Sequence, residues 1–239
     1  MKLRTLDWDS DFFGVRIARL EETRLDPEDV AVLEQEVAAR GIDCVYLLAD
    51  EALPPARALT AGFWPVDERV TLELEPVPEL VLRGGGARPA VAADARALED
   101  IAGEAHRGTR FFTDPHFPKE RSIELYRTWI RNSLGGAADA VLVVDDASGP
   151  AGYATASVKA GGLGEIGLVG VAARARGQGL GRALVAAVVH WIGERGCTRA
   201  QVVTQGLNAV ALRLYQGAGF RIARTQTWYH RWTRDAASR

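Results

Sequence analysis

The chain has few of the residues that build disulfide frameworks or metal sites. Its 239 residues include two cysteines, Cys44 and Cys197, and four histidines. Two cysteines form neither a framework nor a metal set, and they favour a reducing compartment, so no metal is expected. With 29 basic and 31 acidic residues the formal net charge is −2. The chain therefore lacks the basic excess of a nucleic-acid-binding protein, and no nucleic-acid partner is expected.

A targeting segment is also missing from the pattern. Met1-Lys2-Leu3-Arg4 is followed at once by Asp7 and Asp9, which does not resemble a signal peptide. No apolar run is long enough to cross a bilayer. These absences predict a cytoplasmic protein without membrane contact. A hydrophobic share of 47% and a charged share of 25% are typical of a globular protein with one large or two small domains.

The most informative stretch covers residues 165–196. A short apolar run at 166–171 predicts a buried strand, and residues 176–181 form a glycine-rich turn. From Leu180 onward, apolar residues such as Leu184, Val188 and Ile192 recur at helical spacing, and Gly196 ends the predicted helix. The glycine turn (residues 176–181) therefore lies between a strand and the start of an amphipathic helix.

Such a turn suits a pyrophosphate, because glycines let the backbone approach an anion and the first helical N–H groups lack partners. Arg176 and Arg182 add positive charge. The alternative is a tight turn with no ligand. A dinucleotide-binding Rossmann site is disfavoured, because Thr204-Gln205 ends the next strand where an acidic residue would be needed.

The next forty residues continue the pattern. Residues 200–204 predict a second strand, and Asn208 occupies an N-cap position before a helix whose inner face includes Tyr215. Gly219 ends that helix, and Phe220 starts a last, aromatic-rich strand that runs to Trp232.

Three linked motifs carry a resemblance. Arg176-x-x-Gly179-x-Gly181, Asn208-x-x-Ala211 and Leu214-Tyr215-x-x-x-Gly219-Phe220 resemble the acyl-CoA site of the GNAT superfamily of N-acetyltransferases. The resemblance implies an α/β (α+β) GNAT fold, a central mixed sheet with splayed parallel strands flanked by helices. It also implies a smaller N-terminal α/β domain that resembles a truncated GNAT half.

The resemblance implies acetyl-CoA as cosubstrate. Its pantetheine arm would add to the first strand, with Gly170 as a bulge, and its pyrophosphate would lie on the glycine turn. A backbone N–H near Val169 would stabilise the oxyanion. The expected acetyl-CoA contacts are Leu168, Val169, Gly170, Val171, Arg176, Gly177, Gln178, Gly179, Leu180, Gly181, Arg182 and Asn208.

For catalysis the resemblance implies Tyr215 as the general acid, because a phenol of pKa about 10 keeps its proton at neutral pH yet can give it to a thiolate. An isolated tyrosine near a helix end would be a packing residue. The amine must also lose a proton, and Glu165, a water chain or no residue at all are the alternatives. Cys197 begins the loop opposite the site, so direct attack in a ternary complex is expected.

The N-terminal part predicts a helix from Pro27 to Gly41, a strand at 44–48, a short helix ending at Gly62 and a strand through Val70 and Leu74. This order matches that of the C-terminal part, so we interpret the two as a diverged internal repeat or as coincidence. The first copy has Leu59 near the Tyr215 position.

Pro76, Pro78 and Gly84–Gly86 predict a linker, which gives domains at 1–83 and 88–235. The second domain is expected to begin with a strand at 91–94, followed by a helix and a hairpin across 146–149.

The acceptor is expected to contact residues 106–132, where arginines are interleaved with aromatic residues that suit a diphosphate and a base or sugar. A closer resemblance covers most of the chain: residues 6–14, Thr109-Arg110-Phe111, residues 126–132 and Val203-Thr204-Gln205 look like TDP-4-amino-4,6-dideoxygalactose (TDP-fucosamine) N-acetyltransferases. It implies transfer to the amine of a nucleotide-linked amino sugar for surface polysaccharide. The candidate acceptor residues are Arg110, Phe111, Asn132, Gln205 and Glu68.

Two rival functions and a partner complete the expectations. The chain could acetylate another small amine, an antibiotic or a peptide N-terminus, or it could be a non-catalytic acyl-CoA-binding regulatory module. The aromatic last strand, Trp228–Trp232, could pair with the edge of a second copy. The expected homodimer is what the resemblance implies. The sequence leaves open the sugar, the nucleotide, the position of the amine and the length of the acyl donor.

Overall fold

A computed structural model describes residues 2–22, 25–77 and 86–233. The chain forms two compact units that are not continuous in sequence. Unit 1 comprises residues 1–69, 109–121 and 225–239, and unit 2 comprises residues 70–108 and 122–224. This division differs from the predicted domains at 1–83 and 88–235, because residues 109–121 and the chain end belong to unit 1. Most of the predicted linker lies outside the described residues.

Unit 1 is built on strands of mixed direction. In chain order it contains β1 (Leu3–Thr5), α1 (Asp7–Phe13), β2 (Ile17–Leu20), α2 (Pro27–Arg40), β3 (Cys44–Asp50), α3 (Pro55–Thr60), the first half of β4 (Trp64–Leu74), α5 (Arg110–Thr113) and the second half of β10 (Arg221–Trp232). β2 pairs with β1 antiparallel and with β3 parallel, and β3 pairs with β10 antiparallel. The predicted helix, strand and short helix of residues 27–62 are thus confirmed.

Local sequence explains the ends of α2. Pro27 stands in the first turn, where its missing N–H costs nothing, and the Asp29 carboxylate accepts a 3.1 Å hydrogen bond from the Asp26 N–H. Gly41 follows the helix with a φ of 60°, a left-handed conformation that glycine adopts without strain. The buried face of α2 includes Leu33 and Val37, which pack on β3 in the apolar core of unit 1.

Unit 2 contains a larger sheet. Its elements are the second half of β4, β5 (Ala87–Pro89), α4 (Ala95–Ala105), most of α6 (Lys119–Asn132), β6 (Ala140–Asp146), β7 (Gly149–Lys159), β8 (Leu163–Val171), α7 (Leu180–Glu194), β9 (Arg199–Gln205), α8 (Ala209–Gly217) and the first residues of β10. Neighbouring strands run β4-β9-β8-β7-β6-β5. The hairpin predicted across 146–149 is confirmed by β6 and β7, which pair from Asp146 and Gly149 onward.

The strand predicted at 91–94 is wrong. Residues Ala92–Asp94 form a 3₁₀ turn, and the strand lies before them, at Ala87–Pro89. The Asp94 carboxylate accepts hydrogen bonds from Arg88 (2.7 and 3.0 Å) and from the Val91 N–H (2.8 Å). These bonds bend the chain into α4 and override the extended preference of the apolar residues.

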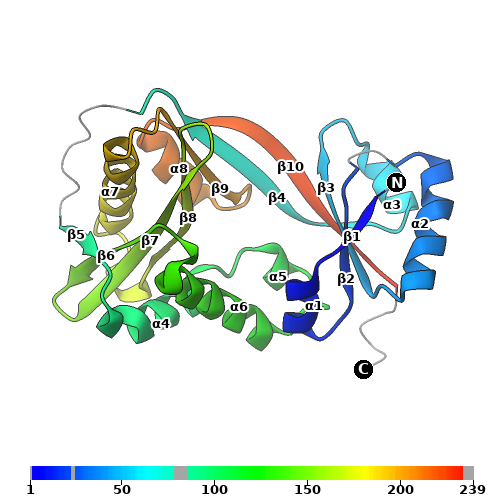
Figure 1. Ribbon diagram of the computed structural model, residues 1–239, viewed down its shortest axis with the longest axis horizontal. Coiled ribbons are helices and arrows are strands. Elements are labelled where there is room, and N and C mark those ends of the chain that lie inside the picture. The colour runs from blue at the N-terminus through cyan, green and yellow to red at the C-terminus, as the bar shows by residue number, and fades with distance from the viewer. Residues whose placement is uncertain (1, 23–24, 78–85, 234–239) are drawn as a thin grey trace. The chain divides into compact units, whose positions relative to one another are not determined.

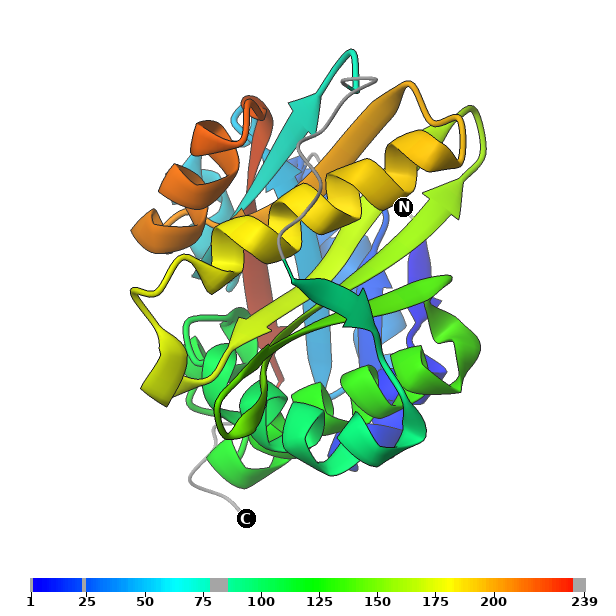
Figure 2. The same ribbon diagram turned by 90° about the vertical axis from the view of Figure 1, so that its left-hand side faces the viewer.

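Helices cover both faces of the unit 2 strands (Figures 1 and 2). α7 lies across one face, where Leu184, Val188 and Ile192 are buried against Ile166 of β8. α4 contacts β7 and β8 from the other face, with Leu98 and Ile101 buried. One strongly apolar helix therefore supports β8 from behind, which fixes the segment that leads into the glycine turn.

The last strand is not an edge. Residues 226–232 of β10 pair with residues 50–44 of β3, and β10 stands between β3 and β4 in the strand order. The backbone groups of Trp228–Trp232 are therefore used within the chain, and the prediction that they pair with a second copy is wrong. Homodimer formation itself stays a prediction. No helix in the described part of the chain has the length and apolarity to cross a membrane.

Candidate active site

Strands β8 and β9 separate along their length. Their parallel ladder runs from Leu163 opposite Arg199 to Ile166 opposite Val202, and among the described residues it ends there. β8 continues to Val171 while pairing only with β7. The backbone groups of residues 167–171 that point away from β7 thus lack a strand partner. An open strand edge of this kind can accept an extended ligand arm by main-chain hydrogen bonds.

A bulge in β8 lies beside the opening, but not at Gly170 as expected. Ala154 stands opposite Val169 and Ala156 opposite Ile166, so Gly167 and Leu168 together face Thr155. The Thr155 hydroxyl accepts a 2.8 Å hydrogen bond from the Leu168 N–H. A Cβ on Gly167 would lie 2.5 Å from that oxygen. The prediction for Gly170 is wrong because the threonine fixes the bulge three residues earlier.

Gly170 has a different function in packing. A Cβ at this position would lie 2.7 Å from the Tyr153 ring, so only glycine lets this ring pack against β8. The fully buried Tyr153 hydroxyl is 3.0 Å from Nε2 of His106, whose ring stacks on Tyr126 at 4.5 Å. Burial lowers the pKa of His106 to about 4, so the ring is neutral at physiological pH. The pair holds the strand from the α4 side.

The glycine turn has the backbone conformation that the sequence predicts. Gly177 and Gly179 have φ values of 77° and 81°, and no atom lies within 4 Å of a Cβ built on either. Gly179 precedes α7 without a side-chain cap, so the N–H groups of Leu180, Gly181 and Arg182 have no intrahelical acceptor. A helix of 15 residues adds the positive end of its dipole. The turn can accept an anion.

Three arginines around the turn differ in their partners. Arg174 is anchored by hydrogen bonds to Asp146 (3.0 and 3.3 Å) and to the Pro150 carbonyl (2.8 Å). Arg176 is exposed and contacts only the Val171 carbonyl, at 3.4 Å, while Arg182 is exposed with no hydrogen bond or ion pair to a described residue. Arg174 therefore fixes the start of the turn, and Arg176 and Arg182 remain available to a ligand.

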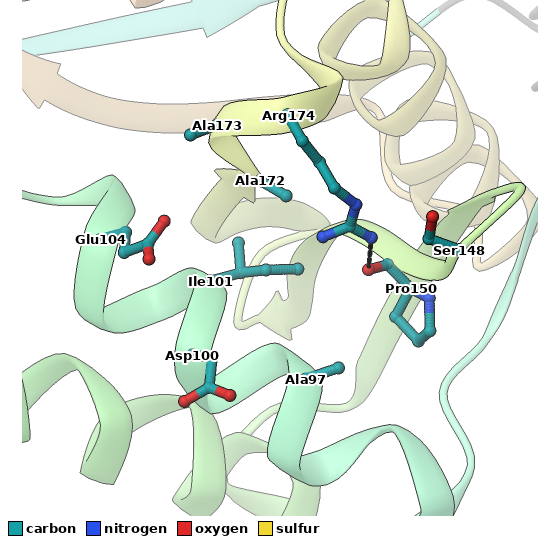
Figure 3. A pocket seen from close by; sticks show the side chains of 9 residues that line it. All are labelled: Ala97, Asp100, Ile101, Glu104, Ser148, Pro150, Ala172, Ala173 and Arg174. Carbon is teal, nitrogen blue, oxygen red and sulfur yellow. Dashed lines mark hydrogen bonds between the residues drawn. The ribbon is translucent and has the colours of Figure 1, made fainter.

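A cavity adjoins the segment that leads into the turn (Figure 3). Its volume is about 580 Å³, and its lining includes Asp100, Ile101 and Glu104 of α4 and Ala172–Arg174 after β8. The Arg174 side chain points across it to Pro150. The sequence reasoning did not anticipate this cavity, because its two sides are about seventy residues apart in the chain.

Helix α8 brings Asn208 and Tyr215 to the same side of the unit 2 core. The Asn208 Oδ1 accepts a 3.1 Å hydrogen bond from the Ala211 N–H, so its predicted N-cap position is confirmed. Leu214 lies 3.4 Å from a Cβ built on Gly181, which places α8 against the first turn of α7. Tyr215 is 4% exposed and belongs to the core that contains Ile166 and Leu184. Burial raises its pKa above the ordinary value, so the phenol keeps its proton.

Glu165 lies away from the open edge. It stands in the paired part of β8, between Ser157 of β7 and Gln201 of β9. Its carboxylate is 3.5 Å from the Lys159 ammonium, and its side chain is 41% exposed. The structure thus places Tyr215 and the start of α7 against the same core, with Asn208 exposed at the start of α8 and Glu165 at the closed end of the ladder.

The candidate acceptor residues are divided between the units. Asn132 is exposed at the end of α6 and Gln205 is half-buried at the end of β9, both in unit 2. Arg110 and Phe111 of α5 and the exposed Glu68 of β4 belong to unit 1. Phe111 is only 2% exposed and stacks on Phe13 at 5.5 Å, so its ring is part of the unit 1 core.

Sequence reasoning missed a buried polar network in unit 1. His230 donates from Nδ1 to Asp114 over 2.6 Å, and the Trp232 Nε1–H donates to the same carboxylate over 2.9 Å. These hydrogen bonds lower the pKa of Asp114, against the effect of its burial. The sequence signal that could have revealed this network is the two-residue period of polar and aromatic side chains in the last strand. One face of β10 carries Gln226, Trp228, His230 and Trp232. Across the described residues, no three His, Cys, Asp or Glu side chains are grouped to hold a metal ion.

A mixed sheet whose parallel pair opens above the uncapped start of a helix defines the GNAT fold. Residues 96–220, more than half of the chain, match the profile of the Acetyltransferase (GNAT) family, and the chain belongs to that family. The fold of a GCN5-related N-acetyltransferase from Sphaerobacter thermophilus agrees with a TM-score of 0.65 at 19% identity, over 98% of this chain and 76% of that one. These findings confirm the predicted fold class.

Two curated relatives are similar in sequence. The spore coat polysaccharide biosynthesis protein SpsD of Bacillus subtilis is 26% identical over 149 residues, which are 60% of this chain and 50% of the relative. The mycothiol acetyltransferase of Acidothermus cellulolyticus is 28% identical over 228 residues, 84% of this chain and 66% of the relative. The chain thus spans half to two thirds of the length of these relatives.

Proposed function

We propose that the protein is an acetyl-CoA-dependent N-acetyltransferase that acts on the amine of a nucleotide-linked amino sugar, a TDP-4-amino-4,6-dideoxyhexose such as TDP-fucosamine. The observation that carries the transferase part is the arrangement in unit 2. The open edge of β8, the uncapped start of α7 and the buried Tyr215 all belong to one core. The sugar part rests on the sequence resemblance and on the polysaccharide biosynthesis relative.

The residues present fit acetyl-CoA, which supplies an acetyl group activated as a thioester. The N–H groups at the start of α7 would hold the pyrophosphate with Arg176 and Arg182. Those backbone groups of residues 168–171 that point away from β7 would hold the pantetheine arm. Asn208 would contact the same arm. A backbone N–H near Val169 would stabilise the negative charge that develops on the carbonyl oxygen.

Tyr215 then acts as the general acid. The acceptor nitrogen attacks directly, and Tyr215 gives its proton to the departing sulfur as the carbon–sulfur bond breaks. The proton that leaves the nitrogen passes to Glu165 or to water, and Tyr215 is reprotonated from solvent. The raised pKa of Tyr215 agrees with a group that enters each cycle protonated.

A mass-spectrometric screen tests the proposal. Purified protein with acetyl-CoA is incubated with a panel of nucleotide-activated 3-amino and 4-amino hexoses. The expected result is a gain of one acetyl group on a TDP-4-amino sugar. Absence of product from every nucleotide sugar, with product from simple amines, would overturn the substrate class while leaving the transferase.

A second candidate is acetylation of another small amine, because a relative named mycothiol acetyltransferase aligns with 84% of the chain. A panel of amines without a nucleotide separates the two candidates. A cytoplasmic location, a homodimer and a contribution to polysaccharide biosynthesis remain predictions.

A further inference from the structure

The two faces of the unit 1 sheet differ in chemistry. On one face Ala18, Val45, Leu47 and Tyr229 pack into the apolar core beneath α2. On the other, register places Arg19 beside Tyr46, Tyr46 beside His230 and Leu48 beside Trp228. We call Arg19, Tyr46, Trp228 and His230, together with Arg110, Asp9 and Asp67 nearby, the polar face. Charged groups rarely occupy a buried sheet face unless they are paired, so this face needs an explanation.

Arg110 is held in one position on the polar face. Its guanidinium lies 4.4 Å from the centre of the Tyr46 ring and 4.3 Å from the centres of the Trp228 and Phe111 rings. Its Nη1–H donates to Nε2 of His230 over 3.2 Å. This fixes the tautomer of His230, whose Nδ1–H donates to the buried Asp114. His230 and Asp114 thus act as a positioning pair for the arginine.

The charge of Arg110 is not neutralised by contact. Within the described residues no carboxylate oxygen lies within 4.0 Å of its guanidinium nitrogens, and four of its five N–H donors have no protein acceptor. Asp67 contacts Arg110 only through the backbone N–H, at 3.3 Å. The Tyr46 hydroxyl is fully buried and has no hydrogen-bond partner in the described structure. The Tyr46 hydroxyl has thus lost water without gaining a partner in the described part of the chain, and Arg110 and Asp67 are half-buried without an ion pair between them.

Among the described residues, the carboxyl groups of Asp9 and Asp67 also lack a partner that would offset their burial. Burial raises the pKa of Asp67 to about 6, and burial also raises the pKa of Asp9, although Arg110 opposes both shifts. A structural ion pair would lower the pKa of each carboxyl. Positive and negative groups are therefore held near one another without contact, an arrangement that costs stability and suits a ligand with both kinds of charge.

We propose that the polar face of unit 1 binds the acceptor, with Arg110 contacting an anionic oxygen and with Asp9 and Asp67 contacting the ammonium or hydroxyl hydrogens. Trp228 offers a flat apolar surface for a sugar or base ring. The proposal rests on the proposed function, because a nucleotide-linked amino sugar carries both a diphosphate and an amine. It adds Asp9, Asp67 and Trp228 to the acceptor contacts, and His230 and Asp114 as positioning residues.

The test compares steady-state kinetics of the full chain with two acceptors, a TDP-linked 4-amino-4,6-dideoxyhexose and the same amino sugar without the nucleotide. Arg110→Gln should raise KM at least tenfold for the first acceptor and less than twofold for the second, because only the first has a diphosphate. Asp67→Asn should raise KM for both. The Kd for acetyl-CoA should stay within twofold.

Matched controls separate binding from folding. Arg57 of unit 1 pairs with Asp26 at 3.0 Å, outside the polar face and outside residues 106–132, so Arg57→Gln should leave KM unchanged. Asp11 lies on the same helix as Asp9, and Asp11→Asn controls for Asp9→Asn. If Arg110→Gln does not fold, Asp67→Asn and Asp9→Asn carry the test. Both should keep or raise the melting temperature, whereas residues of a structural ion pair would lower it.

The outcomes distinguish this proposal from the proposed function. If the wild type acetylates the TDP-amino sugar and the Arg110 and Asp67 variants keep its KM within twofold, the polar face is not the acceptor site. If the wild type acetylates only amines without a nucleotide, and these variants raise KM for them, the substrate class is wrong and the site stands. If it acetylates nothing tested, both proposals fail.

Discussion

Units 1 and 2 contain segments with the same order of elements, but the first turns of their longer helices, α2 and α7, differ in charge. The order β2-α2-β3-α3-β4 parallels β8-α7-β9-α8-β10, and each begins with a parallel strand pair. Helix α2 starts with Asp26, Glu28 and Asp29, whereas α7 starts after Gly179 with no acidic residue in its first turn. Carboxylates at a helix start satisfy the free N–H groups and repel anions. The first unit can therefore fold in the same way and still not bind a pyrophosphate.

The short helices α3 and α8, which follow in the two segments, also differ. Tyr215 of α8 is 4% exposed and lies in the core, whereas Leu59 of α3, near the corresponding position, is 43% exposed and has no proton to donate. The common order supports the predicted internal repeat.

The largest expected effect is at Tyr215, the proposed general acid. Tyr215→Phe should lower kcat by ~10²–10⁴-fold, the usual contribution of a general acid, because the departing sulfur loses its proton donor. The Kd for acetyl-CoA, measured by calorimetry, should not change. Leu59→Ala, the counterpart in α3, should leave kcat unchanged. A kcat for Tyr215→Phe within threefold of wild type would remove Tyr215 as the acid.

The next effect concerns the glycine turn. Gly179→Ala places a Cβ on a residue with a φ of 81°, which costs about 1–2 kcal/mol, and should weaken acetyl-CoA binding about tenfold by moving the N–H groups. Gly14→Ala is the matched control in unit 1, after α1, with a φ of 69° and, as at Gly179, no atom within 4 Å of the added Cβ. It should lower the melting temperature similarly and leave the Kd unchanged. Equal Kd values for the two variants would contradict an anion site at the start of α7.

A smaller effect should follow from making α7 resemble α2. Arg182→Glu introduces an acid into the first turn and should weaken acetyl-CoA binding by about fivefold at low salt, since charges near a helix start contribute ~0.3–1 kcal/mol each. The loss should shrink as ionic strength rises. The exposed Arg221→Glu has the same change of charge and should bind acetyl-CoA like the wild type. A loss of acetyl-CoA affinity that does not depend on ionic strength would indicate a steric cause.

The smallest expected effect concerns the contribution of Asp67, on the polar face of unit 1, to stability. Burial raises the pKa of Asp67 to about 6, while Arg110 lowers it and Glu68 raises it. Its contribution to stability is therefore present below about pH 4 and is lost as pH rises through 6. Asp67→Asn should make the melting temperature depend less on pH over this range. The change should be small, because the side chain is partly exposed to solvent. If the melting temperatures of variant and wild type change with pH in parallel, a raised pKa of the Asp67 carboxyl is contradicted.

Much of unit 2 could be predicted from the sequence because its signals are local. Glycines at 177 and 179, apolar spacing in α7 and the Asn208 cap act within a few residues, and the structure has each of them where the pattern indicated. The bulge could not be predicted in the same way. Gly167 and Gly170 look alike in sequence, and only the pairing with β7 shows that Thr155 meets the first and Tyr153 the second.

The sequence by itself determined the strand, turn and helix that can accept a pyrophosphate, and the likeness to the acetyltransferases, because periodicity, glycine conformation and caps are properties of neighbouring residues. Tertiary structure alone decided the composition of unit 1. Segments 1–69, 109–121 and 225–239 meet there, and Arg110 is fixed by Tyr46, Trp228 and His230 from two distant strands. Contacts between residues so far apart depend on strand register, which no local pattern specifies.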